Sequence, residues 1–211
     1  FISDTDINGL DSVTLFTKNQ FSGAKVKYVI DTRDNAVSPN RGIHLNVEGN
    51  FMSNLDQNSS RHFQQVKADF SFYATFKIPL KTTFAARIGG AVNFGNYEFY
   101  QANYLGGGTN LRGYRNNRFA GDRIFYQNTD LRIKLFRVKS VVINGDVGLI
   151  GFNDIGRVRH EDEGSNKWHH GYGGGIYLTP FNIALISATY NMSRDDKLFV
   201  LNLSLIHISE P

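Results

Sequence analysis

Apolar and polar residues alternate strictly between residues 65 and 78, and this period of two limits the fold of the chain more than any other feature. One parity is apolar and holds Val66, Ala68, Phe70, Phe72, Ala74, Phe76 and Ile78. The other parity is polar and holds Gln65, Lys67, Asp69, Ser71, Thr75 and Lys77. Because successive side chains of a strand point to opposite sides, this alternation predicts a β-strand with one apolar and one polar face.

The same alternation recurs along the chain and predicts nine strands. They are expected at residues 24–30, 43–51, 65–78, 84–94, 125–135, 141–155, 170–178, 183–192 and 198–205. Short turns at residues 79–82, 137–139 and 179–182 join strands at one end. The polar turn at residues 31–42 lies at the same end but is longer. Most connections at the other end are longer and polar. Alternating segments with short turns at one rim and long loops at the other are typical of outer-membrane β-barrels.

A soluble antiparallel sandwich would also alternate, so the character of the two faces must decide between the two folds. The apolar faces are rich in Phe and Tyr, of which the chain has 17 and 10, as lipid-facing bands are. The opposite faces carry Lys, Arg, Asp and Glu, which a sandwich core would not tolerate and a water-filled lumen would. The sequence therefore favours an all-β fold, an antiparallel transmembrane β-barrel. The mean hydropathy of -0.32 does not exclude it, because lipid-facing and lumen-facing residues average out in such barrels.

Nine strands do not complete a barrel of this kind. Bacterial single-chain barrels have even strand numbers and close completely, because lipid cannot satisfy the backbone groups of an open edge. We therefore expect residues 1–205 to be the C-terminal part of a larger outer-membrane barrel. Residues 206–211, IHISEP, break the alternation and resemble a translated sequencing-adapter read-through, so we expect them to be a non-native tail.

The stretch of residues 105–122, LGGGTNLRGYRNNRFAGD, has no periodicity but holds five glycines and three arginines. A loop of this length is usually either functional or disordered. Alternation places Asp130 and, on the following strand, Asp154 on the inward faces of the wall. Because a carboxylate inside a barrel needs a cation, we predict that the loop folds into the lumen and that Arg112 pairs with both carboxylates. The alternative is that Arg112 lies in a solvated extracellular loop.

Three motifs give the chain a resemblance to a known family. The first is similar to the (V/I/L)RG(F/Y) motif of the BamA/TamA superfamily of outer-membrane assembly factors, and consists of Leu111, Arg112, Gly113 and Tyr114. The second, within GFNDIG at residues 151–156, resembles the F-x-D-x-G motif of that family and consists of Phe152, Asp154 and Gly156. The third, IDTRDNAVSPNRG at residues 30–42, resembles a recurrent turn of the family. The three follow one another in the order and at the spacing of the family.

The resemblance implies a role for each of these residues. In that family the first motif lies in the long sixth extracellular loop, which folds into the barrel, and this is the place implied for Arg112. The strand of Asp154 would receive the arginine, and Asp130 would be a second acidic partner. These residues would be architectural rather than catalytic. The nine strands would be the last nine of sixteen, although the chain lacks the N-terminal periplasmic repeat domains, the first half of the barrel and the terminal aromatic residue of the family.

The function implied by the resemblance is insertion or translocation of proteins at the outer membrane of a Gram-negative bacterium, without cofactor or covalent chemistry. The implied partners are outer-membrane lipid, unfolded outer-membrane or secreted client proteins, and periplasmic accessory proteins. Two alternatives stay open. The barrel could anchor or secrete a fused N-terminal enzyme, such as a phosphoesterase or a patatin-like lipase, or it could be a simple diffusion porin.

Composition leaves little room for other chemistry. The absence of cysteine excludes a thiolate nucleophile or metal site, and the net charge of +4 is spread out, with no basic arm for nucleic acid. One loop does gather residues that could ligate a metal, namely His160, Glu161, Asp162, Glu163, His169 and His170. No pair among them has the spacing of a zinc motif, so we expect a solvated loop, no metal and no catalytic residue.

Overall fold

The structure is a computed structural model that describes residues 20–55, 62–77, 79–95, 97, 101–140, 144–159, 167–181 and 183–205. Its strands are β1 (Phe21–Asp31), β2 (Gly42–Asn54), β3 (His62–Lys77), β4 (Lys81–Gly95), β5 (Asn103–Leu105), β6 (Phe119–Gly121), β7 (Arg123–Lys139), β8 (Asn144–Arg159), β9 (His169–Pro180), β10 (Ala184–Ser193) and β11 (Lys197–Leu205). Within these residues, no helix could cross a lipid bilayer.

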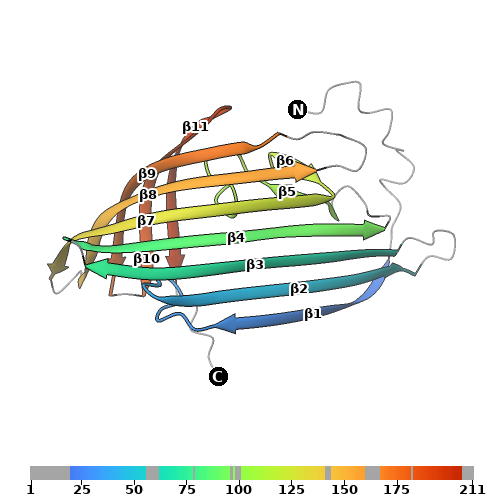
Figure 1. Ribbon diagram of the computed structural model, residues 1–211, viewed down its shortest axis with the longest axis horizontal. Helices are drawn as coiled ribbons and strands as arrows, with labels where there is room; N and C mark the ends of the chain where they lie inside the picture. The colour runs from blue at the N-terminus through green and yellow to red at the C-terminus, as the bar shows by residue number, and fades with distance from the viewer. Residues whose placement is uncertain are drawn as a thin grey trace.

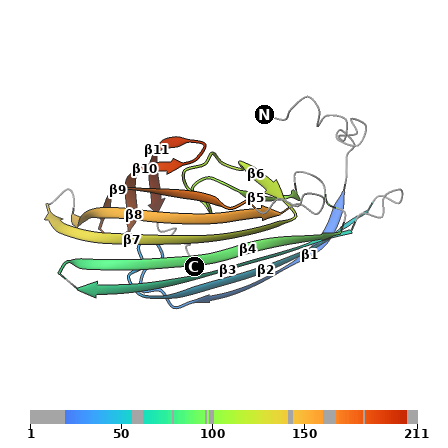
Figure 2. The same ribbon diagram turned by 45° about the horizontal axis from the view of Figure 1, so that its top comes forward.

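Nine strands of the described residues form one antiparallel sheet, in the order β1-β2-β3-β4-β7-β8-β9-β10-β11. Each of them corresponds to one predicted strand, so the predicted all-β antiparallel class is confirmed. Figures 1 and 2 show that the sheet curls, so that β9, β10 and β11 lie behind β7 and β8 with β5 and β6 in the space between. In the part of the chain that the structure describes, β1 and β11 are the edges and do not pair with each other. The sheet is therefore a curved, open wall.

The two ends of the wall differ in their connections. At one end, named here the turn end, β3 is joined to β4 and β9 to β10 by tight connections, and residues 32–41 join β1 to β2. At the other, named the loop end, residues 96–122 join β4 to β7. This long loop contains the small hairpin β5–β6 and turns back into the concave side of the wall (Figure 2).

Two details differ from the expectations drawn from the sequence. The hairpin β5–β6 was not predicted, because strands of three residues are too short to show a period of two. The turn predicted at residues 137–139 is wrong, because β7 continues to Lys139, which pairs with Asn144. A β-bulge between Lys134 and Phe136 leaves both Leu135 and Phe136 exposed. The bulge interrupts the alternation, and the pattern in the sequence therefore stops before the strand does.

Some expectations concern residues outside the described part of the chain. They are the loop before residue 20, the start of a strand at residues 141–143, the tail at residues 206–211, and the residues His160, Glu161, Asp162 and Glu163. The assignment of residues 1–205 to a larger barrel stays a prediction.

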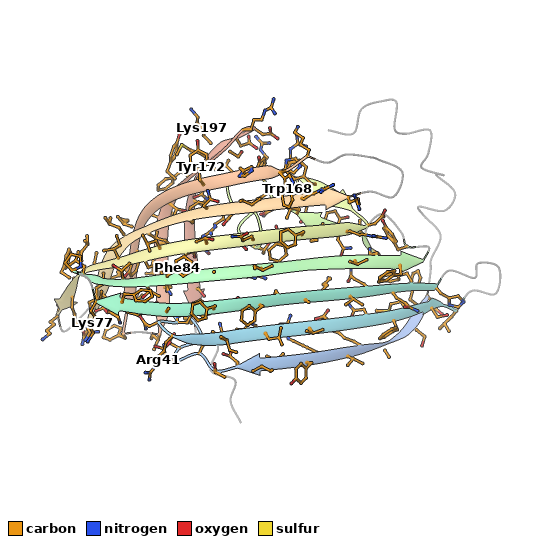
Figure 3. The ribbon with its side chains drawn as sticks, in the orientation of Figure 1. Arg41, Lys77, Phe84, Trp168, Tyr172 and Lys197 are labelled. Atoms are coloured by element: carbon orange, nitrogen blue, oxygen red, sulfur yellow. The ribbon has the colours of Figure 1, made fainter. Side chains whose placement is uncertain are left out.

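The two faces of the wall expose different kinds of side chain. On β3 the outward Phe72 is 43% exposed, whereas the inward Ser71 is 4% exposed. Large apolar side chains are exposed in the same way on other strands, among them Tyr28, Ile88, Leu131, Ile176 and Leu201. In Figure 3, Phe84 lies on the wall away from its ends, and Arg41 and Lys77 lie at the turn end. An exposed apolar band between polar rims is the outer surface of a barrel that lies in lipid.

We expect Phe72→Lys to lower the free energy of unfolding in lipid by about 2–4 kcal/mol, because it places a charge on the lipid-facing side of the wall. Asn46→Lys is the matched control, since the Asn46 amide faces the lumen and donates to Asp69 at 3.1 Å, where an ammonium group can replace it. Urea unfolding in lipid vesicles measures both changes. Equal destabilisation by the two lysines would contradict this assignment of the faces.

Candidate functional site in the lumen

The long loop is a compact unit with its own internal contacts. The Asn110 side-chain amide donates to the carbonyl oxygen of Tyr104 at 3.0 Å, and its oxygen accepts the N–H of Gly106 at 2.9 Å. Leu105 and Leu111 have no exposed surface and pack in an apolar cluster between the loop and the wall. The apolar burial fixes the start of the LRGY motif, and the motif arginine is therefore held at a defined place in the lumen.

Arg112 reaches two carboxylates on neighbouring strands. Its Nε and Nη2 donate to Oδ2 and Oδ1 of Asp154 on β8 at 2.7 and 2.6 Å, so this pair is bidentate. Its backbone N–H also donates to Oδ2 of Asp154, at 2.9 Å. Nη2 donates in addition to Oδ1 of Asp130 on β7, at 2.5 Å. One loop residue is thus joined to two adjacent strands of the wall.

Burial makes this contact stronger than an ion pair on a protein surface. The Asp154 side chain is 0% exposed and the Arg112 side chain 19%. Burial by itself lowers the pKa of Arg112, but the hydrogen bond with Asp154 and the charge of Asp130 outweigh it and hold the pKa above its ordinary value. The guanidinium carbon also lies 3.9 Å from the ring centre of Phe152, within the range of a cation–π contact. The positive charge therefore meets carboxylates and an aromatic face inside the lumen.

Positions without a side chain allow the loop to lie directly against the wall. Gly113 has a φ of +90°, which glycine adopts readily, and a Cβ there would lie 2.7 Å from a backbone oxygen of β10. On β9, a Cβ at Gly171 would lie 1.7 Å from the carbonyl oxygen of Arg112. On β8, a Cβ at Gly156 would lie 2.8 Å from the side chain of Leu105. The neighbouring atoms of Gly113 and Gly171 are backbone and cannot move aside, so these two glycines let the loop lie directly against β9 and β10.

Polar side chains of β4 and β7 hold the loop as well. Arg87 of β4 donates from Nη1 to the carbonyl oxygen of Thr109 at 2.9 Å and from Nη2 to the hydroxyl of Tyr126 at 3.0 Å. The Asn128 amide of β7 donates to the carbonyl oxygen of Asn110 at 2.9 Å. The loop backbone just before Leu111 is therefore bonded to β4 and β7, as the backbone just after it is bonded to Asp154.

The last residue of the LRGY motif belongs to an aromatic cluster. The ring of Tyr114 meets the rings of Phe119 and His169 edge-on, with centroids 5.3 and 5.9 Å away. Phe119 and His169 are stacked at 3.8 Å. His169 is thus part of the packing between the loop and β9. Among the described residues, no group of three His, Asp or Glu side chains could hold a metal ion.

The structure places the sequence-predicted residues in one region of the lumen. Arg112 is in contact with both Asp130 and Asp154. The other predicted residues lie in the loop or on the strand beneath it, and they are Leu111, Gly113, Tyr114, Phe152 and Gly156. Reasoning from the sequence missed Gly171 and Arg87. Alternation shows that Arg87 faces inward, but it does not show which groups Arg87 contacts. The role of Gly171 follows only from the strand register, which places it opposite Asp154.

The chemistry of these groups suits attachment rather than proton transfer. A guanidinium group keeps its proton throughout the accessible pH range. Both oxygens of the Asp154 carboxylate already accept hydrogen bonds from Arg112. The arrangement can therefore hold a loop across the inside of the wall.

A known family covers this region of the chain. The model of the Omp85 superfamily domain matches residues 12–196. This range includes the long loop, the strands that carry Asp130 and Asp154, and the turn at residues 31–42. No curated protein gives a significant match.

We expect Arg112→Ala to lower the free energy of unfolding by about 3–5 kcal/mol, because it leaves the fully buried Asp154 carboxylate without a cation. Arg115→Ala is the control in the same loop. Arg115 is 77% exposed and 3.9 Å from its nearest carboxylate, so its loss should change stability by less than about 1 kcal/mol. Urea unfolding and heat-modifiable electrophoretic mobility measure the effect. Adding Asp154→Asn to the Arg112→Ala variant should restore part of the lost stability. Equal stability of Arg112→Ala and Arg115→Ala would speak against the buried ion pair.

We expect Gly171→Ala to displace the loop and to lower the free energy of unfolding by about 1–3 kcal/mol, because the added methyl group overlaps the carbonyl oxygen of Arg112. Gly151→Ala is the matched control on β8, since nothing lies within 4 Å of a Cβ there. Trypsin cleavage at Arg115 and Arg118 should be several-fold faster in the Gly171 variant only. If both variants are cleaved at the rate of the unaltered protein, the loop does not depend on this contact.

Proposed function

The chain belongs to the Omp85 superfamily, whose members are outer-membrane barrels that insert or translocate proteins, and on this premise we propose that it forms the wall of a BamA/TamA-type assembly barrel. Its clients would be unfolded outer-membrane or secreted proteins, and its location the outer membrane of a Gram-negative bacterium. Outer-membrane lipid and periplasmic accessory proteins complete the proposed partners. The barrel would work without a cofactor and without catalytic residues.

The observation that carries this proposal is the loop held inside the wall by Arg112. Charge-assisted hydrogen bonds of the kind that Arg112 makes contribute about 1.5–3 kcal/mol each when they are partly removed from water. A pore for free diffusion needs an open lumen, whereas this loop lies on the concave side of the wall and is bonded to β4, β7 and β8. A wall that is held in shape from its concave side supports a barrel that works by opening the wall to clients, and not by letting solutes diffuse through it.

The mechanism that we propose follows the BamA/TamA resemblance, in which the first and last strands of the barrel meet at a weakly paired seam. An unpaired edge presents backbone N–H and C=O groups that can pair with another strand. In the proposed mechanism the seam of the barrel opens at such an edge to admit a client strand, while the loop of Arg112 keeps the rest of the wall in shape.

The function is tested by the folding of a client in lipid vesicles. Vesicles that carry the protein should fold a urea-unfolded outer-membrane protein several-fold faster than empty vesicles, as followed by the electrophoretic mobility shift of the client. Arg112→Ala should lose most of this acceleration, because the loop no longer braces the wall, and Arg115→Ala should keep it.

Two results would contradict the proposal. Client folding at the rate of empty vesicles would favour a barrel that anchors or secretes a fused enzyme. A large and steady single-channel conductance that Arg112→Ala leaves unchanged would indicate a diffusion porin.

A further inference from the structure

The turn between β1 and β2 is a rigid unit at the turn end of the wall. The Asp34 carboxylate accepts the backbone N–H groups of Asn40 at 2.7 Å and of Arg41 at 3.2 Å. The side-chain oxygen of Asn35 accepts the N–H of Ser38 at 2.8 Å. Side chains that satisfy backbone donors in this way fix the shape of a turn. The turn is therefore preorganised and can serve as one side of a binding site.

A buried arginine joins this turn to the inside of the wall. Arg132 of β7 is 7% exposed, and its Nη1 donates to Oγ of Ser38 at 2.9 Å. Its Nη2 donates to the carbonyl oxygen of Pro39. On β3, the Thr75 hydroxyl donates to the carbonyl oxygen of Asn40 at 2.7 Å. The turn thus lies beneath the lumen and does not extend away from it.

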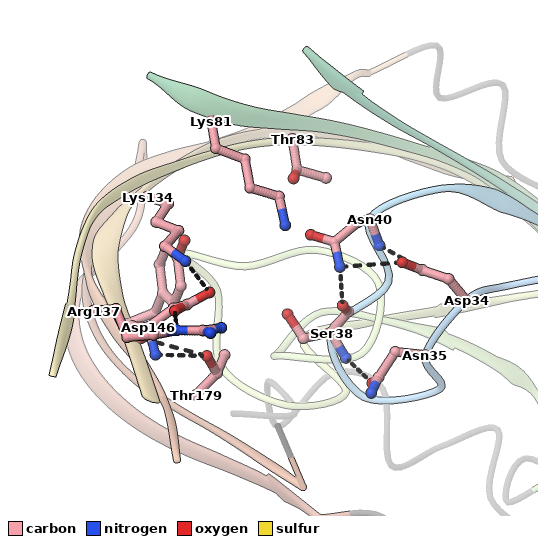
Figure 4. A pocket seen from close by; sticks show the side chains of 11 residues that line it. Asp34, Asn35, Ser38, Asn40, Lys81, Thr83, Lys134, Arg137, Asp146 and Thr179 are labelled. Atoms are coloured by element: carbon pink, nitrogen blue, oxygen red, sulfur yellow. Dashed lines mark hydrogen bonds and ion pairs between the residues drawn. The ribbon is translucent and has the colours of Figure 1, made fainter. Parts of the chain in front are cut away.

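A cavity of about 250 Å³ remains between the turn and the wall, and its lining is polar (Figure 4). Residues from β4, β7, β8 and β9 line it on the wall side. The charged groups of the lining are Asp34, Lys81, Lys134, Arg137 and Asp146. The cavity is large enough for a small charged group, and it is unsuited to an apolar side chain.

The positive charges of this lining exceed the negative ones. Asp146 contacts both Lys134 and Arg137 at 2.6 Å, and the Asp34 carboxylate accepts the N–H groups of its own turn. The Lys81 ammonium points into the cavity, and within the described part of the chain it makes no ion pair (Figure 4). Three cations thus face two carboxylates. Walls of low dielectric constant focus such an excess of charge on the cavity and attract an anion.

We propose that this cavity binds the carboxylate group of an unfolded polypeptide, with the Lys81 ammonium as the cation that pairs with it. The Thr83 hydroxyl in the lining lies 2.8 Å from the Thr75 hydroxyl and donates to it, because Thr75 donates its own proton to Asn40, so Lys81 is the group that remains for the ligand. The inference rests on the proposed function, because it requires polypeptides to reach the turn end. A client would thus be held at its charged group, next to the entrance of the lumen.

The experiment measures the binding of two unstructured peptides by fluorescence anisotropy. Both carry a neutral fluorophore at the N-terminus and no acidic side chain, and one ends in a free carboxylate whereas the other is amidated. The protein should bind the free carboxylate about tenfold more tightly, which corresponds to about 1.4 kcal/mol. Lys81→Met should abolish this difference, and Lys81→Arg should keep most of it.

Lys77→Met is the matched control. Lys77 lies opposite Lys81 in the backbone pairing of the β3–β4 hairpin, but its side chain does not line the cavity. Equal losses in the two methionine variants would show attraction by the general charge of the rim and would overturn the proposal. Equal affinities of the two peptides would overturn it as well. Displacement of the peptide by glycerol phosphate at far lower concentration than by acetate would indicate a phosphate site and would also overturn it.

Two further measurements distinguish loss of the binding site from loss of folding and from loss of the assembly function. Should Lys81→Met fail to fold, displacement of the peptide from the unaltered protein by acetate but not by acetamide supports the proposal, and equal displacement overturns it. Peptide binding requires no folding of a client. A protein that binds the carboxylate but does not accelerate client folding would therefore refute the assembly function and leave the site in place.

Discussion

A carboxylate without contact to water is stable in a protein only when a cation and hydrogen-bond donors reach it, and Asp154 is such a group. Its cation is Arg112, which lies 42 residues earlier in the chain. This single requirement explains why the long loop turns back into the concave side of the wall. It also explains the glycines of the interface, because a guanidinium group makes a bidentate contact only when the loop backbone lies close to the strands.

Strand β7 connects the two segments that lie inside the wall. Its inward residues Asp130 and Arg132 are neighbours on one face. Asp130 accepts a hydrogen bond from the loop arginine, and Arg132 donates hydrogen bonds to the turn between β1 and β2. A loop from one end and a turn from the other are therefore attached to adjacent positions of the same strand. Both attachments are partly buried and short, whereas the ion pair of Arg115 in the same loop is exposed and longer and so contributes less.

The sequence predicted what depends on local periodicity. Alternation located the strands of the main sheet and placed Asp130 and Asp154 on the inward face, and the need of those carboxylates for a cation pointed to Arg112. Features without a local signature were missed. The bulge at Lys134 changes the alternation and hides the end of β7. The contact of Gly171 depends on the register of β9, and register follows from the pairing of segments that are far apart in the sequence.

The position of the loop within the chain has a consequence for the order of folding. The loop rests on Gly171 of β9 and on the backbone of β10, and both strands follow it in the sequence. It therefore reaches its final place only after those later strands have joined the sheet. Before this step Arg112 has no fixed contact with the wall, whereas in the completed sheet its side chain is largely covered. The placement of the loop thus depends on the wall being complete as far as β10.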